Sequence, residues 1–203
     1  MATAREHPRS TQTAIRELFD ESARAKRIFL EENADALERA IDVVAGAFAA
    51  GRKLLLFGNG GSAADAQHIA AEFVGRFLRE RRALPAIALT TDTSALTAIA
   101  NDYGYDEVFA RQVRALGTRG DVALAISTSG RSASVLRAVD ACREIGVTTI
   151  GLTGGDGGTL AGSIDVSLRV SASRISARIQ ETHILVGHVI CELVDRRLFG
   201  DSA

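Results

Sequence analysis

The chain has 203 residues and a formal net charge of −1, which is long enough for one α/β domain with a substantial core. The near-neutral balance argues against a charge-dominated partner, so we expect neither nucleic acid nor a membrane. Cys142 and Cys191 form no CxxC pair, and no apolar run reaches the roughly 18 residues of a membrane span. These features predict a cytoplasmic protein with reduced thiols.

The predicted elements begin after a polar segment, residues 1–10, which we expect to be flexible. Two apolar stripes predict two leading helices over about 11–50, the second capped by Asn33. Strands and helices then alternate, which predicts a single α/β domain over 11–203: a doubly wound, five-stranded parallel sheet of the flavodoxin-like type. The predicted strands are Lys53–Phe57, Pro85–Leu89, Asp121–Ser127, Val147–Leu152 and Asp165–Val170, and the predicted helices between and after them are 62–79, 94–101, 106–116, 132–145 and 174–198.

The first predicted strand runs into a glycine-rich turn, Gly58-Asn59-Gly60-Gly61-Ser62, and then into a helix. Glycines let a ligand approach the backbone, and the free N–H groups of the helix point at the same place. His68 and Glu72 follow at i and i+4 and therefore share one face of this helix. The stretch predicts a polar-ligand site beside an acid/base or metal-binding pair.

A second loop follows the third predicted strand and carries four hydroxyls: Ser127, Thr128, Ser129 and Ser132. Hydroxyls, a glycine and a helix N-terminus suit a phosphate group, although an ordinary serine cap would explain part of the pattern. No Walker lysine is present, which argues against nucleoside triphosphate chemistry. The glycine-dense loop 153–159 is interpreted as a turn and left out of the site.

Other polar residues leave alternatives open. Asn101 and Asp102 suit sugar hydroxyls or Asx turns equally. On the last predicted helix, spacing would sooner pair Gln180 with His183 than with His188, and a lone histidine there is more often a core residue. The cluster of Arg76, Arg79, Arg81 and Arg82 is interpreted as the solvated end of a helix, with Arg76 as the expected exception because it lies four residues beyond Glu72 on the same side.

Taken together, the motifs resemble the phosphoheptose isomerase family of sugar-isomerase (SIS) domain enzymes. The segments that carry the resemblance are Gly58–Ser62, His68 with Glu72, Asn101-Asp102, Ser127–Gly130 and Arg178–Glu181 with His188. The resemblance implies isomerisation of sedoheptulose 7-phosphate to D-glycero-D-manno-heptose 7-phosphate, on the route to the heptose of lipopolysaccharide or other glycans. It also implies a homotetramer with sites at subunit interfaces and one zinc ion per subunit.

The family pattern, carried over residue by residue, assigns roles in this chain. It makes Glu72 the catalytic base and His188 the acid, and so chooses His188 over His183. The implied zinc ligands are His68, Glu72, Gln180 and His188. The implied substrate contacts are Asn59, Gly60, Gly61, Glu72, Asn101, Asp102, Ser127, Thr128, Ser129, Ser132 and Gln180. One departure is Ala177, where many relatives carry an acid.

Two other functions are considered. The chain also resembles the DnaA initiator-associating protein, a non-catalytic SIS-domain relative, and Ala177 fits that alternative. Glu72 and His188 favour the isomerase, because that relative does not keep the acid/base pair. A dinucleotide-binding domain would use Gly58-x-Gly60-x-x-Ala63, but no acidic residue ends the second predicted strand.

Overall fold

The computed structural model describes residues 10–200, so the segment 1–10, predicted to be flexible, lies almost wholly outside the described residues. Five parallel strands form one sheet in the order β2-β1-β3-β4-β5, which is the flavodoxin-like order predicted from the sequence. The strands are β1 (Leu54–Gly58), β2 (Ala86–Ala88), β3 (Val122–Ser127), β4 (Thr148–Gly154) and β5 (Val166–Val170). Each predicted strand is confirmed to within two residues at either end.

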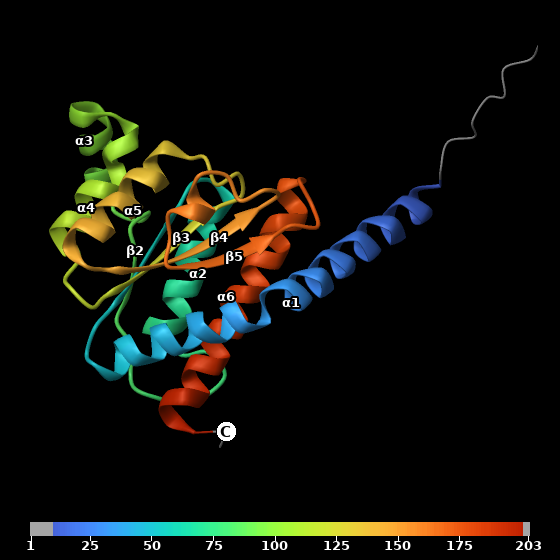
Figure 1. The fold of residues 1–203 in the computed structure, drawn as a ribbon, viewed down its shortest axis with the longest axis horizontal. Coiled ribbons are helices and arrows are strands. Elements are labelled where there is room, and N and C mark those ends of the chain that lie inside the picture. The colour runs from blue at the N-terminus through green and yellow to red at the C-terminus, as the bar shows by residue number, and fades with distance from the viewer. Residues whose placement is uncertain (1–9, 201–203) are drawn as a thin grey trace, which may run out of the picture.

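Helices cover both faces of the sheet (Figure 1). Side chains of β1 alternate between the two cores: Leu54 and Leu56 face α1, α2 and α6, whereas Leu55 and Phe57 face α4 and α5. The helices are α1 (Thr11–Ala49), α2 (Gly61–Val74), α3 (Thr93–Tyr103), α4 (Val108–Leu116), α5 (Ala133–Ile145) and α6 (Ser176–Phe199), with 3-10 turns at Tyr105–Glu107 and Leu160–Gly162. Cys142 and Cys191 are free and buried, and burial raises the pKa of Cys142 to about 12.

α1 is one helix of 39 residues, so the prediction of two leading helices is wrong. Asn33 does not cap a second helix. Its Nδ2 donates to the carbonyls of Phe29 at 2.9 Å and Arg169 at 3.2 Å, and its Oδ1 accepts from the Arg169 N–H at 3.1 Å. The side chain thus acts as a partner for edge strand β5, whose outer backbone groups would otherwise lack one.

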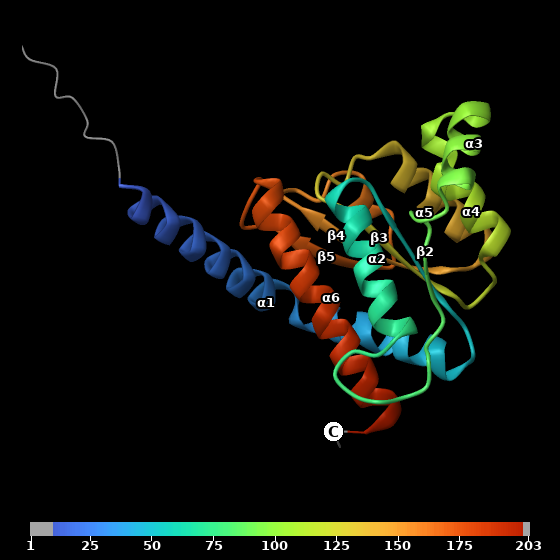
Figure 2. The same cartoon turned by 180° about the vertical axis from the view of Figure 1, so that it is seen from behind.

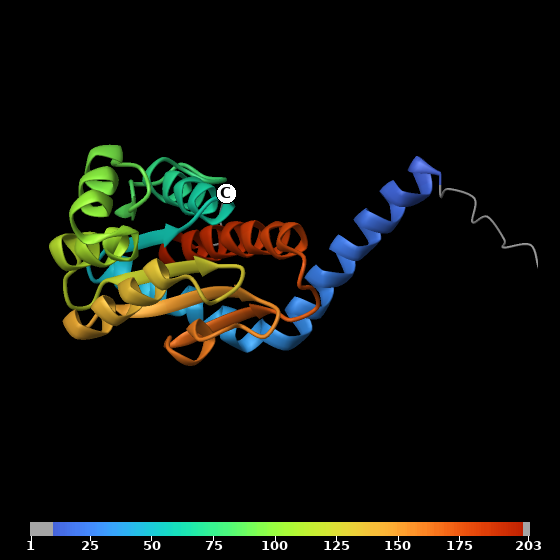
Figure 3. The same ribbon diagram turned by 90° about the horizontal axis from the view of Figure 1, so that it is seen from above.

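The N-terminal half of α1 extends away from the body of the molecule (Figures 1 and 3). Ile15, Leu18 and Phe19 on this half are 50%, 51% and 75% exposed. A helix depends mainly on packing of its apolar side for stability, and this half has no such cover within one chain. Among the residues that the structure describes, no helix has the length and apolar character needed to span a membrane.

We expect Asn33→Ala to lower the free energy of unfolding by about 1–3 kcal/mol, because the Arg169 N–H and C=O would lose their side-chain partner. Urea denaturation measures the change. Asp35→Ala, at an exposed position of the same helix, is the matched control and should have a much smaller effect. Equal effects of the two substitutions would contradict this account of Asn33.

Candidate functional site

The turn between β1 and α2 depends on glycine at three successive points. A Cβ on Gly58 would lie 2.7 Å from the Ile126 carbonyl oxygen, and Gly60 has a φ of +57°. A Cβ on Gly61 would lie 2.3 Å from Gln180 Nε2. The Gln180 side chain therefore rests directly on the first residue of α2, and the two helices that carry the predicted metal ligands begin in contact.

Helices α2 and α6 lie side by side from this point onward (Figure 2). Their proximity brings His68 Nε2 to 2.9 Å from His188 Nε2 and to 3.3 Å from Glu72 Oε1. The His68 side chain is 49% exposed and that of Glu72 is 24% exposed, so the cluster opens to solvent. Three of the four predicted metal ligands, including the predicted acid and base, thus meet at one place.

This cluster fits a zinc ion. One ligand atom from each of His68, Glu72 and His188 can be chosen so that all lie within 4.8 Å of one another. In tetrahedral geometry with Zn–N bonds of about 2.0–2.1 Å, neighbouring ligand atoms lie about 3.3 Å apart, close to the distances found here. Two imidazoles and a carboxylate are also ligands that zinc accepts.

His183 faces the sheet and not α2. It is fully buried, its Nε2 lies 3.1 Å from the Thr153 carbonyl oxygen, and burial lowers its pKa to about 4. A neutral imidazole with Nε2 protonated donates to that carbonyl. His188 is therefore the histidine that joins the cluster, and the pairing of Gln180 with His183 that helical spacing favoured is wrong.

In the hydroxyl loop after β3, two serine side chains bond to backbone N–H groups of the same loop. Ser127 Oγ accepts from the Gly130 N–H and Ser129 Oγ accepts from the Arg131 N–H, both at 3.2 Å. Ser132 stands at the N-cap of α5, yet its side chain makes no capping bond there. An ordinary serine cap is therefore not what holds this loop, and no side-chain cap occupies the N-terminus of α5.

Asn59 connects the two loops. Its Nδ2 donates to Ser132 Oγ at 2.8 Å and to Ser134 Oγ at 3.0 Å, while its Oδ1 accepts from the Tyr105 hydroxyl at 2.8 Å. Tyr105 was not singled out in the sequence, although it lies three residues beyond the Asn101-Asp102 pair. The turn after β1 and the loop after β3 thus form one surface, held by Asn59 and Tyr105.

Asn101 and Asp102 are not brought into the cluster by any described contact. Both are exposed at the end of α3, where Asn101 Nδ2 donates to Asp102 Oδ1 at 2.8 Å. The link from this segment to the site runs through Tyr105, which lies just beyond α3.

The loop after β4 packs against the hydroxyl loop. From the sequence it was interpreted as a turn outside the site. A Cβ on Gly130 would lie 1.9 Å from the Gly157 carbonyl oxygen, so the two backbones are in direct contact. Arg131 and Asp156 form an exposed ion pair at 2.7 Å, and the hydrogen bond from Arg131 lowers the pKa of Asp156 to about 2. A hollow of about 240 Å³ lies between the two loops, with Arg174 on its rim.

Arg81 departs from the predicted solvated helix end, because its side chain is only 1% exposed. It pairs with Asp195 of α6 at 2.9 Å and donates to backbone carbonyls at the end of α2. Arg76, the expected exception, instead pairs with Glu80 at 2.9 Å, and both side chains are exposed.

Comparison with known proteins places this geometry in a family. The SIS domain model matches residues 17–154. A phosphoheptose isomerase from Roseiflexus sp. (strain RS-1) is 58% identical over 183 residues, covering 90% of this chain and 92% of that protein. One from Halorhodospira halophila is 54% identical, covering 92% and 95%. The chain belongs to the phosphoheptose isomerase family.

Solved structures agree with this assignment. A phosphoheptose isomerase from Neisseria gonorrhoeae superposes with a TM-score of 0.86 at 48% identity, covering 92% of this chain and 99% of that one. One from Francisella tularensis gives a TM-score of 0.88 at 38% identity, covering 92% and 99%. These likenesses do not favour the initiator-associating or the dinucleotide-binding alternative.

The pH dependence of stability should reveal His183. Its pKa is about 4 in the folded state and near 6.5 when unfolded, so below pH 6.5 the unfolded chain binds a proton that the folded chain does not. Stability is therefore lost as the pH falls from 6.5 toward 4, by roughly 2 to 3 kcal/mol at pH 4.5.

His183→Gln keeps a donor for the Thr153 carbonyl without the titration. Urea denaturation at pH 7 and pH 4.5 should show a smaller loss for this variant than for the wild type, since the carboxylates titrate in both proteins. The same loss in both would contradict a neutral, buried His183.

Proposed function

We propose that the chain is a phosphoheptose isomerase that converts sedoheptulose 7-phosphate to D-glycero-D-manno-heptose 7-phosphate. The observation that carries the proposal is the meeting of His68, Glu72 and His188 beside the glycine turn and the hydroxyl loop. The cluster supplies an acid and a base, and the loops supply an anion-binding surface. High identity to enzymes of this name supports the substrate class.

Ketose–aldose isomerisation moves one proton between neighbouring carbons. In the proposed mechanism the Glu72 carboxylate removes a proton from C1, and the His188 imidazole gives a proton to the oxygen on C2, which forms an enediol. Glu72 then returns the proton to C2 while His188 accepts one from the oxygen on C1. A histidine suits the second role because it can exchange protons near neutral pH.

One zinc ion per subunit is part of the proposal. His68, Glu72 and His188 would hold it, with the Gln180 carboxamide as the fourth ligand. Glu72 and His188 would each bind the ion through one atom, which leaves the other carboxylate oxygen and the other ring nitrogen to exchange protons. When bound, the ion polarises the carbonyl and stabilises negative charge on its oxygen.

The phosphate would bind the hydroxyl loop, remote from the reacting carbons, and its binding energy would orient those carbons.

Ala177 is exposed in the first turn of α6, so no carboxylate is contributed from the position where many relatives carry an acid. The proposed substrate contacts are Asn59, Gly60, Gly61, Glu72, Asn101, Asp102, Ser127, Thr128, Ser129, Ser132 and Gln180. The proposed setting is the cytoplasm, on the route to the heptose of lipopolysaccharide or related glycans.

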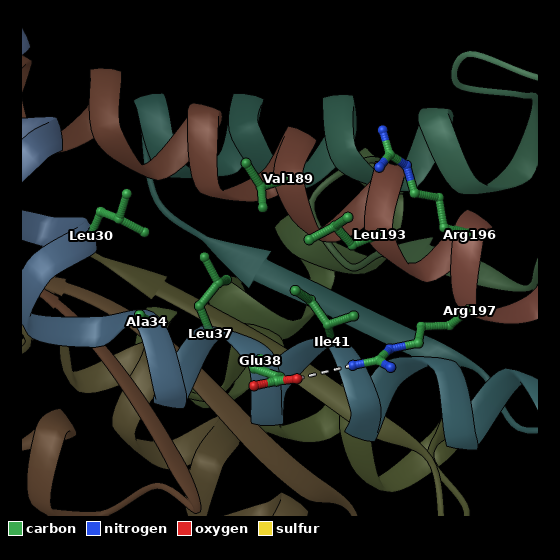
Figure 4. Close-up of a pocket in the computed structure, with 9 residues that line it drawn as sticks. All are labelled: Leu30, Ala34, Leu37, Glu38, Ile41, Val189, Leu193, Arg196 and Arg197. Atoms are coloured by element: carbon green, nitrogen blue, oxygen red, sulfur yellow. Dashed lines mark hydrogen bonds and ion pairs between the residues drawn. The ribbon is translucent and has the colours of Figure 1, made fainter. Parts of the chain in front are cut away.

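We also propose a homotetramer, with α1 as its main contact. A groove of about 650 Å³ lies between α1 and α6 (Figure 4). Leu30, Leu37 and Leu193 line it, and Arg197 pairs across it with Glu38 at 3.2 Å. On the N-terminal side of the groove, α1 also carries the exposed apolar residues Ile15, Leu18 and Phe19. A second copy of the same helix is a self-complementary occupant for such a surface.

An assay on sedoheptulose 7-phosphate with added zinc tests the function. We expect turnover by the wild type, and a loss of about 100-fold or more in kcat for Glu72→Gln and for His188→Ala, because each removes a proton-transferring group. Glu80→Gln, an exposed glutamate paired with Arg76, is the control and should retain kcat. A folded wild type with no turnover, with zinc or after chelation, would overturn the proposal.

Phe19→Glu tests the assembly. A charge at this 75% exposed position should disfavour a helix–helix interface and shift the species measured by light scattering toward smaller oligomers. Leu116→Glu, at a 43% exposed leucine ending α4 on the other face of the sheet, is the control and should leave the mass unchanged. An unchanged mass for Phe19→Glu would contradict an interface at this end of α1.

A further inference from the structure

The segment between α2 and β2 holds the ends of both helices that carry the cluster. Arg81 reaches the end of α2 and Arg79 reaches the end of α6, where it donates to the carbonyls of Phe199, at 3.2 Å, and Gly200. Of the two, the Arg81 side chain is almost fully buried.

Arg81 binds the last turn of α2 through backbone carbonyls that no helical N–H can reach. Its Nη2 donates to the Glu72 carbonyl at 2.8 Å, and its Nη1 donates to Phe73 at 2.8 Å and Gly75 at 2.9 Å. Such end carbonyls require partners from outside the helix. The residue proposed as the catalytic base is therefore held at its own backbone by Arg81.

The same guanidinium holds α6. Its Nε donates to Asp195 Oδ1 at 2.9 Å, and the Asp195 side chain is 4% exposed. Asp195 lies about two turns beyond His188 on α6. One planar side chain thus connects the backbone of Glu72 to the helix of His188, and its five donors lie in a fixed geometry.

Two other contacts between the helices involve glycine: Gly61 against Gln180, described above, and Gly187 against Ile69, next to His188 and His68 in the chain. A Cβ on Gly187 would lie 2.5 Å from Ile69 Cδ1, so α2 and α6 already touch there. The glycine contacts limit how closely the helices approach, and the Arg81–Asp195 pair fixes them at the end of α2. Along the two helices, the acid/base pair lies between the Gly61 contact and the Arg81–Asp195 pair.

We propose that Arg81, through its buried pair with Asp195, is a positioning residue that sets the separation of Glu72 from His188. This inference rests on the function proposed above. Arg81 does not touch the reacting groups themselves. It acts by fixing α2 against α6, so its loss should impair turnover and metal binding without weakening the contacts of the phosphate loop.

The test compares Arg81→Gln, Arg81→Lys and Asp195→Asn with Arg79→Gln, which removes the neighbouring arginine that caps only α6. For each protein, kcat and KM for sedoheptulose 7-phosphate are measured with excess zinc. Zinc affinity is measured by competition with a chromogenic chelator, and thermal unfolding is recorded. We expect Arg81→Gln to lose at least about tenfold in kcat and in zinc affinity, with KM within about twofold of the wild type.

Arg81→Lys keeps the charge opposite Asp195 but cannot span the three carbonyls. Its kcat and zinc affinity should therefore lie between those of Arg81→Gln and the wild type. Arg79→Gln should lower the unfolding temperature while leaving kcat and zinc affinity near wild type. If Arg81→Gln lowers only the unfolding temperature, the residue is merely structural and the proposal is overturned. If Arg81→Gln does not fold, unchanged kcat and zinc affinity in Asp195→Asn overturn it instead.

An inactive wild type would refute the proposed function but not this inference. The separation of the His68 and His188 rings, 5.1 Å between centroids here, can be compared in crystals of the wild type and of whichever of Arg81→Gln and Asp195→Asn folds. That comparison needs neither substrate nor metal. An unchanged separation, with zinc affinity also unchanged, would overturn the positioning role.

Discussion

The site depends on the close packing of α2 against α6. This packing is possible because glycine occurs once on each helix where they touch: Gly61 lies under Gln180, and Gly187 lies against Ile69. A Cβ at either position would come within 2.3 Å or 2.5 Å of a side-chain atom of the other helix. At Gly61 the side chain that would have to move is the flexible Gln180, whereas at Gly187 it is the buried Ile69, so a larger residue at Gly187 would push the helices and their imidazoles apart.

The parallel sheet brings the other half of the site to the same edge. β1 and β3 are neighbours, and chain connections leave them toward opposite ends of the sheet, so the loops after them flank a crevice. Asn59 closes that crevice by bonding to the hydroxyl loop and to Tyr105. The proposed chemistry at the helices and the proposed anion binding at the loops would therefore both be positioned by one glycine-rich turn, which ends β1 and begins α2.

Most of the fold could be predicted from the sequence because the central strands β1, β3 and β4 are buried on both faces and form short apolar runs between turns. Two of the errors share one cause. Asn33 and Arg81 were interpreted from local patterns, as a cap and as a solvated cation, yet their partners Arg169 and Asp195 lie 136 and 114 positions away. The spacing of residues along one helix or strand gives no information about such distant pairs. A polar residue that bonds to the backbone of a distant strand or helix end is therefore missed.

The two histidines of α6 show where periodicity could have gone further. Ile179, Val186 and Ile190 belong to the buried stripe of α6, and His183 falls on it. His188 lies five residues on, which is about 140° around the helix, and so belongs to a different face. The apolar stripe could therefore have assigned His183 to the core. Which helix the other face meets depends on the sheet order, and this is why spacing along α6 alone favoured the wrong histidine.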